Sequence, residues 1–346
     1  MTGERAVEGS IDGAVGARGK RFGLGAPSSA LGAFMVLSDE VAEAILDRHA
    51  VVALESTLIS HGFPYPENLA IARESEAAVR SAGAVPATVA IHDGRFLVGL
   101  TPDALEELAT ARGVAKVARP TLAAALARGG WGATTVSATM IAADVAGIAV
   151  FATGGIGGVH RGALVAADGS RGSLDISADL DELARTPVVV VCAGPKLILD
   201  VALTVEALET RGVPLLTIGA DEVPGFWARC SGVPTPISVA SVEEAARVAS
   251  IHFALGLRSG LLVCVPVPEQ DEVPRERIEI VIQQANDEAA ASGIRGAATT
   301  PWLLARVAEL SEGDSVRANL SLIRNNASTA ARLAVSLESW TSAAGV

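Results

Sequence analysis

Aromatic side chains are scarce in this chain of 346 residues: they make up 3% of it, and Tyr65 is the single tyrosine. Half of the residues are hydrophobic, so Ala, Val, Leu and Gly must fill the core, which suits close packing of helices on a sheet. The chain is long enough to bury a sizeable core, and its length is compatible with one domain or two.

Positive charge is also in short supply. The chain carries 39 acidic and 27 basic residues, for a formal net charge of −12 and a pI near 5.0. A broad face for nucleic acid needs clustered Lys and Arg, so we expect no nucleic-acid partner, although a local pocket could hold a small anion. The apolar stretches are too short and too interrupted to span a bilayer, so we expect no membrane partner.

Cysteine is rare too. Cys192, Cys230 and Cys264 lie far apart without metal-binding spacing, as expected for buried thiols in a reducing cytoplasm. The N-terminal stretch has scattered charges and glycines and lacks the apolar run of a secretory signal. We therefore expect a cytoplasmic protein with a disordered tail over residues 1–36 and a folded domain over 37–340.

Apolar runs typical of buried strands alternate with helical patterns along most of the chain. Two such runs over residues 87–100 meet at Asp93-Gly94, which favours the positive φ of a hairpin turn. The alternation predicts a single-domain α/β fold, a three-layer α/β/α sandwich with a mixed sheet. We expect further strands at 50–57, 114–118, 147–155, 187–194, 213–218 and 260–265, and helices at 38–49, 66–83, 101–113, 120–128, 136–146, 177–186, 196–211, 241–256, 274–292, 300–311 and 315–339.

Lysine is the scarcest charged residue, since only Lys20, Lys116 and Lys196 accompany 24 arginines. Lys196 lies in "VVVVCAGPKLILD" (188–200), after a strand and at the expected start of a helix. Apolar neighbours and a helix N-terminus favour the neutral amine, which is a nucleophile. The alternative is a lysine whose stem covers apolar surface. Arg could do that equally well but cannot form a Schiff base, so the scarcity favours a functional lysine.

Other polar residues follow predicted strands, where ligands gather in open α/β sheets. Glu55 ends an apolar strand and is either a surface carboxylate or a general acid/base. Lys116 is either an edge-strand lysine or a phosphate contact. The glycines of 154–158 are not a dinucleotide fingerprint, because His160 takes the place of the third glycine. They form either a phosphate-binding loop or a simple turn.

Two further patterns are compatible with either a structural or a functional role. The acidic cluster in "SLDISADLDEL" (173–183) is either a helix cap or a site for a hard ion such as Mg²⁺ or Mn²⁺. Asn319 and Asn326 share a helical face over 315–328, and either of them caps a loop or reaches a ligand.

Taken together, long motifs of this chain closely resemble the pseudouridine-5′-phosphate glycosidase family, also called indigoidine synthase A-like. The resemblance runs from about residue 37 to 338. It is carried by "LESTLISHGFPYP" (54–66), "GATTVSATMIAADVAGIAVFATGGIGGVHRGA" (132–163), "DISADLDELA" (175–184), the Lys196 segment and "NLSLIRNNASTAARLA" (319–334).

The resemblance implies reversible cleavage of the C–C glycosidic bond of pseudouridine 5′-phosphate to uracil and ribose 5-phosphate. It implies that Lys196 forms an imine with C1 of the opened ribose and that Glu55 is the acid/base. It also implies one Mn²⁺ at Asp175, held largely through water, and a homotrimer. The substrate-binding positions that it implies are Lys116, Val136, Thr153, His160, Ser177, Ala178, Asp179 and Asn319.

The chain departs from the family at residues 164–173, which are several residues longer than expected and favour a surface loop or a lid. Asp168 in this insertion competes with Asp175 for the metal, and the intact "DISAD" motif favours Asp175. Ordinary two-carboxylate glycoside hydrolysis suits a C-glycoside badly, because the bond has no heteroatom leaving group. The alternatives are a Schiff-base enzyme on another sugar phosphate, a pigment-pathway accessory, or a silent nucleotide-binding homologue.

Overall fold

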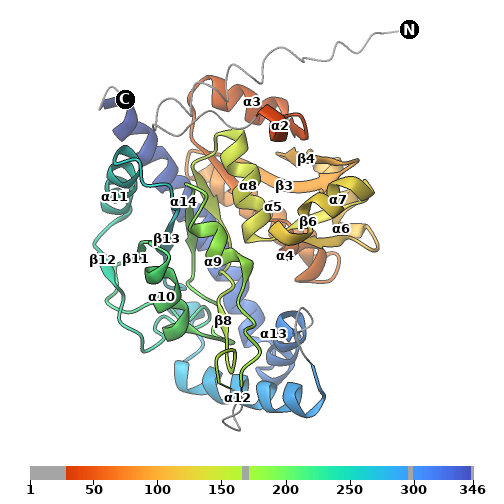
Figure 1. Cartoon of the computed structure of the whole chain (residues 1–346), viewed down its shortest axis with the longest axis vertical. Coiled ribbons are helices and arrows are strands. Elements are labelled where there is room, and N and C mark those ends of the chain that lie inside the picture. The colour runs from red at the N-terminus through yellow and green to blue at the C-terminus, as the bar shows by residue number, and fades with distance from the viewer. Residues whose placement is uncertain (1–28, 166–170, 295–298, 344–346) are drawn as a thin grey trace.

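The computed structural model describes residues 29–165, 171–294 and 299–343. An 11-stranded mixed sheet runs through the molecule in the order β1-β4-β3-β2-β7-β9-β13-β11-β12, with β6 paired to β3 and β5 paired to β6 (Figure 1). Its strands are β1 Met35–Leu37, β2 Val51–Leu54, β3 Val85–His92, β4 Arg95–Val98, β5 Ala115–Val117, β6 Gly132–Thr134, β7 Val150–Ala152, β9 Val189–Cys192, β11 Leu215–Ile218, β12 Ile237–Val239 and β13 Leu261–Cys264. A separate antiparallel pair joins β8 (Val159–His160) to β10 (Leu199–Asp200).

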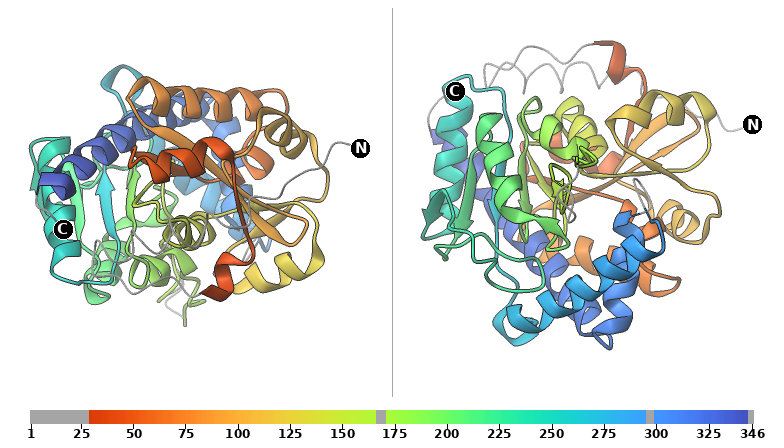
Figure 2. Two further views of the ribbon diagram at one scale, coloured as in Figure 1. Left: turned by 90° about the horizontal axis from the view of Figure 1, so that it is seen from above. Right: turned by 60° about the horizontal axis from the view of Figure 1, so that its bottom comes forward.

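Helices cover both faces of the sheet, as Figure 2 shows. Successive strand residues point to opposite faces, so Val190 packs into one cluster of buried side chains and Val191 into the other. Both faces are therefore dry, which explains the unbroken valine run and confirms the three-layer sandwich. One face carries α5 (Glu67–Ser81), α11 (Val242–Ala254) and α14 (Asp314–Ala343), and the other carries α3 (Asp39–Leu46), α8 (Val136–Ala146), α9 (Ala178–Leu183) and α10 (Val201–Thr210).

The remaining helices lie around the edges of this sandwich. Helices α12 and α13 pack together at one end of the molecule, where the chain turns before entering α14 (Figure 1). The bounds of all these remaining helices are α2 Ser29–Gly32, α4 Thr57–His61, α6 Pro102–Thr110, α7 Leu122–Arg128, α12 Arg275–Ala291 and α13 Thr299–Leu310, with short 3₁₀ turns at Arg119–Thr121 and Glu269–Asp271. Within the described ranges, no helix combines the length and apolar character needed to cross a membrane.

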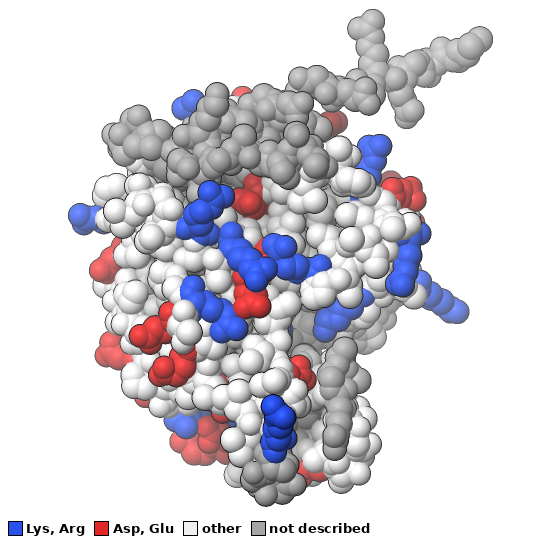
Figure 3. Space-filling model, viewed as in Figure 1, with Lys and Arg blue, Asp and Glu red and all other residues white. Residues whose placement is uncertain are grey.

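Charges of both signs share the surface drawn in Figure 3, where basic side chains gather around the middle with acidic ones between them. Several basic side chains are ion-paired. Arg211 bonds Asp181 at 2.7 Å, and the Arg119 guanidinium bonds the fully buried carboxylate of Glu182, with an Nη2–Oε1 distance of 2.7 Å. A carboxylate without solvent requires such a partner, so Arg119 has a structural role here.

The hairpin expected over 87–100 is confirmed, because β3 and β4 pair antiparallel around Asp93-Gly94. The helix expected from residue 196 is wrong at its start. Residues 199–200 form β10, and the Asp200 side chain caps the next helix by accepting the Leu203 N–H at 2.9 Å, so α10 begins at Val201. Lys196 thus lies in a turn and not at a helix N-terminus.

The described chain begins earlier than the expected domain boundary at residue 37. Residues 29–37 contain α2 and β1, and β1 pairs with β4 at the edge of the sheet. Residues 1–28 of the expected tail, and residues 166–170 of the expected surface loop, lie outside the described residues.

One half-buried carboxyl group, that of Glu76, predicts a pH-dependent stability. Burial raises the pKa of Glu76 above its ordinary value of 4.5, against a hydrogen bond of 2.5 Å that the Thr88 hydroxyl donates to it. Because the pKa of Glu76 is higher in the folded than in the unfolded protein, its protonated form stabilises the fold at low pH. That stabilisation is lost as the pH rises through the folded-state pKa. We expect Glu76→Gln to raise the urea midpoint at pH 7 and to have little effect near pH 4. The exposed Glu43→Gln is the control, and an equal gain at both pH values would contradict the expectation.

Candidate active site

Three neighbouring parallel strands end at the same edge of the sheet and supply the central residues of the site. Strand β7 lies between β2 and β9 and is parallel to both. The residues that follow them are Glu55 after β2, Thr153 after β7 and the Ala193–Lys196 turn after β9. This is the edge at which open α/β sheets bind ligands.

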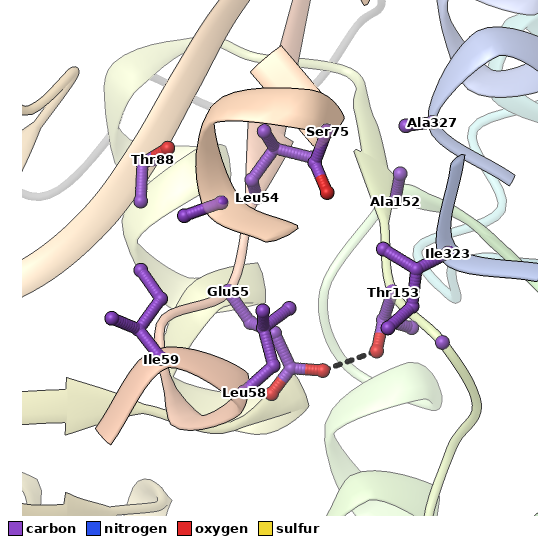
Figure 4. A pocket seen from close by; sticks show the side chains of 12 residues that line it. Leu54, Glu55, Leu58, Ile59, Ser75, Thr88, Ala152, Thr153, Ile323 and Ala327 are labelled. Carbon is purple, nitrogen blue, oxygen red and sulfur yellow. Dashed lines mark hydrogen bonds between the residues drawn. The ribbon is translucent and has the colours of Figure 1, made fainter. Parts of the chain in front are cut away.

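Ser56 anchors the turn that carries Glu55. Its buried hydroxyl donates to the Val89 carbonyl at 2.6 Å and accepts the Thr134 N–H at 2.9 Å, which ties the turn to β3 and β6. Glu55 is 9% exposed and accepts hydrogen bonds from the hydroxyls of Thr57 and Thr153; Figure 4 shows the bond from Thr153. The carboxylate is therefore held between two elements at the end of β2.

The turn that carries Lys196 is tightly fitted. Gly194 has φ +84°, and a Cβ there would lie 2.5 Å from the Pro224 carbonyl oxygen, so the position requires glycine. The Lys196 N–H donates to the Ile156 carbonyl at 3.2 Å. Just beyond, the Arg161 guanidinium donates to the Leu197 carbonyl at 2.9 Å. The backbone of Lys196 is thus fixed on both sides while its half-buried side chain faces a pocket.

This pocket encloses about 820 Å³, counting its open mouth. It brings together Glu55, Lys196, Lys116 and Asn319, which the sequence had singled out, so four distant segments meet there. Its other lining residues are Thr57, Leu58, His61, Gly62, Phe63, Gly154, Gly155, Phe226, Thr300, Pro301, Leu304 and Ile323. The last four come from α13 and α14, so the C-terminal helices close one side of the pocket.

The charges around the pocket act on one another. Loss of solvent lowers the pKa of Lys116, the nearby Lys196 charge lowers it further, and the carboxylates of Glu55 and Asp179 oppose both. Burial also lowers the pKa of His61, and the Lys116 charge adds to that effect. A surplus of positive charge in one pocket favours an anionic ligand such as a sugar phosphate.

His160 lies on β8, opposite Leu199 of β10. Burial lowers its pKa, the Asp175 carboxylate raises it, and the Lys196 charge lowers it. The charges of Asp175, the expected metal ligand, and Lys196, the expected nucleophile, therefore both act on the His160 imidazole. His160 does not line the main pocket.

The segment from Ser177 to Asp179 supports the glycine loop. Asp179 accepts the Gly157 N–H at 2.9 Å and the Ser137 N–H at 3.2 Å, and Ser177 caps α9, which begins at Ala178. A Cβ on Gly157 would lie 2.3 Å from the Ser177 hydroxyl. The loop thus needs its glycine for close packing, while Gly154 and Gly155 face the pocket. Val136 begins α8 with its side chain buried in the core.

Asp175 offers one half-buried carboxylate near His160, whose pKa it raises, and it does not line the main pocket. Among the residues that the structure describes, no group of three or more His, Cys, Asp or Glu could enclose a metal ion. The described residues around Asp175 therefore do not form a site in which protein side chains alone enclose a metal ion. One carboxylate fits an octahedral ion such as Mn²⁺ or Mg²⁺ that keeps most of its ligands as water and substrate oxygens.

Sequence patterns did not identify several pocket residues. Thr57 is polar and follows the first buried strand, which is a usable signal. Phe226 carries a weaker one, since it is one of only seven phenylalanines. Phe226 adopts φ +61°, a costly conformation for a residue with a Cβ. Its ring packs so closely on Gly155 that a Cβ added to Gly155 would lie 2.7 Å from the ring. Leu304 comes from α13, and no local pattern relates that helix to the end of β2.

The fold and the pocket define an α/β protein whose lysine, carboxylate and basic side chains converge at the carboxyl ends of parallel strands. Residues 40–336 match the family model described as indigoidine synthase A like protein. The chain belongs to this family.

Curated relatives match nearly their whole length. A pseudouridine-5′-phosphate glycosidase of Solibacter usitatus is 51% identical over 302 residues, which cover 87% of this chain and 99% of that protein. The enzyme of the same name from Paracoccus denitrificans is 52% identical over 305 residues, which cover 88% and 98%.

Solved structures agree with the fold. The prealnumycin C-glycosynthase AlnA in complex with ribulose 5-phosphate is 38% identical and superposes with a TM-score of 0.82, covering 92% of this chain and all of that one. An indigoidine synthase A-like protein from Thermotoga maritima is 32% identical with a TM-score of 0.77, covering 88% and 97%.

Proposed function

We propose that this protein is a pseudouridine-5′-phosphate glycosidase that cleaves its substrate reversibly to uracil and ribose 5-phosphate. The observation that carries the proposal is the presence of Lys196 and Glu55 in one pocket with Lys116. The names of relatives about half identical over most of the chain support the substrate. The AlnA complex, whose ligand is a five-carbon sugar phosphate, supports the sugar-phosphate part of it.

In the proposed mechanism, Glu55 protonates the ribose ring oxygen as the bond from C1 to that oxygen breaks. The Lys196 amine adds to C1, and its nitrogen gives a proton to the Glu55 carboxylate. Glu55 then protonates uracil C5, and the lone pair of the Lys196 nitrogen forms a C=N bond as the bond between C1 and C5 breaks and returns its electron pair to the base. Water hydrolyses the imine to release ribose 5-phosphate and regenerate the amine.

The remaining polar residues fit binding roles. Lys116 lines the pocket with an exposed side chain and is the proposed phosphate contact, and Asn319 lines the wall beside Gly154. We assign Val136 a backbone contact, and Ser177, Ala178 and Asp179 a contact segment next to the glycine loop. His160 stands near Lys196, where a neutral imidazole could bond a sugar hydroxyl.

We also propose that Asp175 holds one Mn²⁺, which would order water and substrate oxygens. We expect chelation to abolish turnover, added Mn²⁺ to restore it, and Asp175→Asn to raise the Mn²⁺ concentration needed for half-maximal rate by about tenfold or more. Steady-state uracil release at graded Mn²⁺ measures this. Unchanged rates after chelation would remove the metal from the proposal.

A homotrimer in the cytoplasm is the assembly and location that we propose from the family resemblance. Light scattering coupled to gel filtration measures the subunit number. A monomer at working concentration would refute the trimer.

Trapping of the covalent intermediate tests the proposed chemistry. The protein is incubated with ribose 5-phosphate, reduced with borohydride and digested, and mass spectrometry locates the adduct. We expect one ribitol phosphate adduct, on Lys196. Turnover of pseudouridine 5′-phosphate without any adduct at Lys196 would refute the imine.

The likeness to a C-glycosynthase favours one second candidate, a Schiff-base enzyme that joins a sugar phosphate to a different acceptor. Lys196 would be trapped in both cases. Uracil consumption with ribose 5-phosphate decides between them, since only the glycosidase forms pseudouridine 5′-phosphate.

A further inference from the structure

Glu55 lies between the open pocket and a small recess that is mostly apolar. Leu54, Ile59, Ala152, Ile323 and Ala327 line the recess, and the carboxylate stands at its boundary (Figure 4). In such surroundings a hydrogen bond to a carboxylate is stronger than in water, and a missing one is more costly.

Each oxygen of this carboxylate has its own hydroxyl donor. Thr57, the first residue of α4, donates to Oε2, and Thr153, just after β7, donates to Oε1. Two donors from separate elements restrict rotation of the carboxylate. In the described structure, the Thr153 hydroxyl is engaged by Glu55 and not free for a ligand.

Asn326 fixes the segment that carries Thr153. It is fully buried in α14, and its Nδ2 donates to the Thr153 carbonyl at 2.9 Å and to the Gly154 carbonyl at 3.2 Å. Its Oδ1 is buried with no partner among the described residues. Turning the amide over would place that oxygen against two carbonyl oxygens, so only one orientation holds the segment.

We propose that Thr57, Thr153 and Asn326 are positioning residues that hold the Glu55 carboxylate in one orientation, an inference that rests on the function proposed above. The series runs from the Asn326 amide through the backbone of Thr153 to its hydroxyl and on to Glu55. All three residues thus act in the reaction through Glu55.

Crystal structures of the variants test this without relying on turnover. We expect the Glu55 carboxylate to lose its single orientation in Thr57→Val and in Thr153→Val, because each variant removes one of its two hydroxyl donors. Thr57→Ser and Thr153→Ser keep the hydroxyl and should show the wild-type orientation.

Asn326→Leu keeps the volume and removes both amide bonds, so we expect the Thr153 segment to shift and kcat to fall by less than in the valine variants. Thr217→Val is the matched control. Thr217 is a buried threonine of β11, whose hydroxyl pairs with that of Thr235 at 2.8 Å, far along the sheet from Glu55. Should a valine variant fail to fold, the alanine variant at the same position takes its place.

Kinetics then separate positioning from binding. We expect the valine variants to lower kcat by about tenfold or more with KM within about twofold, because a loosely held carboxyl group is less often aligned for proton transfer. A single, wild-type orientation of Glu55 in both valine variants overturns the proposal. Absence of wild-type turnover on pseudouridine 5′-phosphate overturns the proposed function instead, and the crystal structures still decide the positioning.

Discussion

Lys196→Arg is expected to lose turnover by roughly 10⁴-fold or more, because the guanidinium keeps the positive charge but cannot act as an amine nucleophile. The same variant should show no borohydride-trapped adduct with ribose 5-phosphate. Its fold should survive, since the turn is held by the Lys196 N–H and by Arg161 and not by the lysine head group. Uracil release and adduct mass spectrometry measure both effects.

Chemical rescue provides the matched control for this variant. Lys196→Cys treated with bromoethylamine regains an amine of nearly the same length, and activity should return with it. The background is Cys230→Ser, because Cys230 is the partly exposed thiol among the described residues while Cys192 and Cys264 are buried. Robust turnover by Lys196→Arg would assign the nucleophile to another group.

Glu55→Gln is expected to lower kcat by about 10²–10⁴-fold, the usual contribution of a general acid/base. The amide fills the same space between Thr57 and Thr153 but cannot exchange protons at useful rates. Because ribose 5-phosphate already supplies an open-chain aldehyde, Lys196 should still be trapped by it in this variant. The two measurements therefore separate loss of proton transfer from loss of the nucleophile.

Glu55→Asp is the companion variant, since it keeps the acid and withdraws it by one methylene. We expect intermediate activity, because proton transfer requires a distance close to a hydrogen bond. Full activity in Glu55→Gln, measured by single-turnover kinetics, would exclude Glu55 as the acid/base.

The sequence pattern predicted the sandwich because the two signals that indicate it, a buried apolar strand and a hairpin turn, are local. Val188–Val191 reads as a strand buried on both faces, and Asp93-Gly94 reads as a hairpin turn. Strands of two or three residues, such as β1 and β10, are too short to show a period. The start of α10 was misplaced because Leu197–Leu199 reads equally well as a helical turn, whereas the actual signal is the Asp200 cap.

The site was predictable to the extent that polar residues directly follow apolar strands. Glu55 and Lys196 stand out in that way, and the structure brings them into one pocket. The pocket walls from α13 and α14 depend on contacts between segments more than 100 residues apart, for which the chain contains no local signal. Asn326 shows the limit most clearly, since its face on α14 was visible but its partners were not.

The length of chain between the parts of the site has a consequence for biosynthesis. Helix α14 packs on α5, α11 and the central strands, and it supplies both the amide that holds Thr153 and a wall of the pocket. Synthesis proceeds from the N-terminus at about 5–20 residues per second, so Glu55 leaves the ribosome well before α14 is made. A nascent chain that already carries both Glu55 and Lys196 still lacks a finished pocket, and catalysis therefore begins only after release of the last helix.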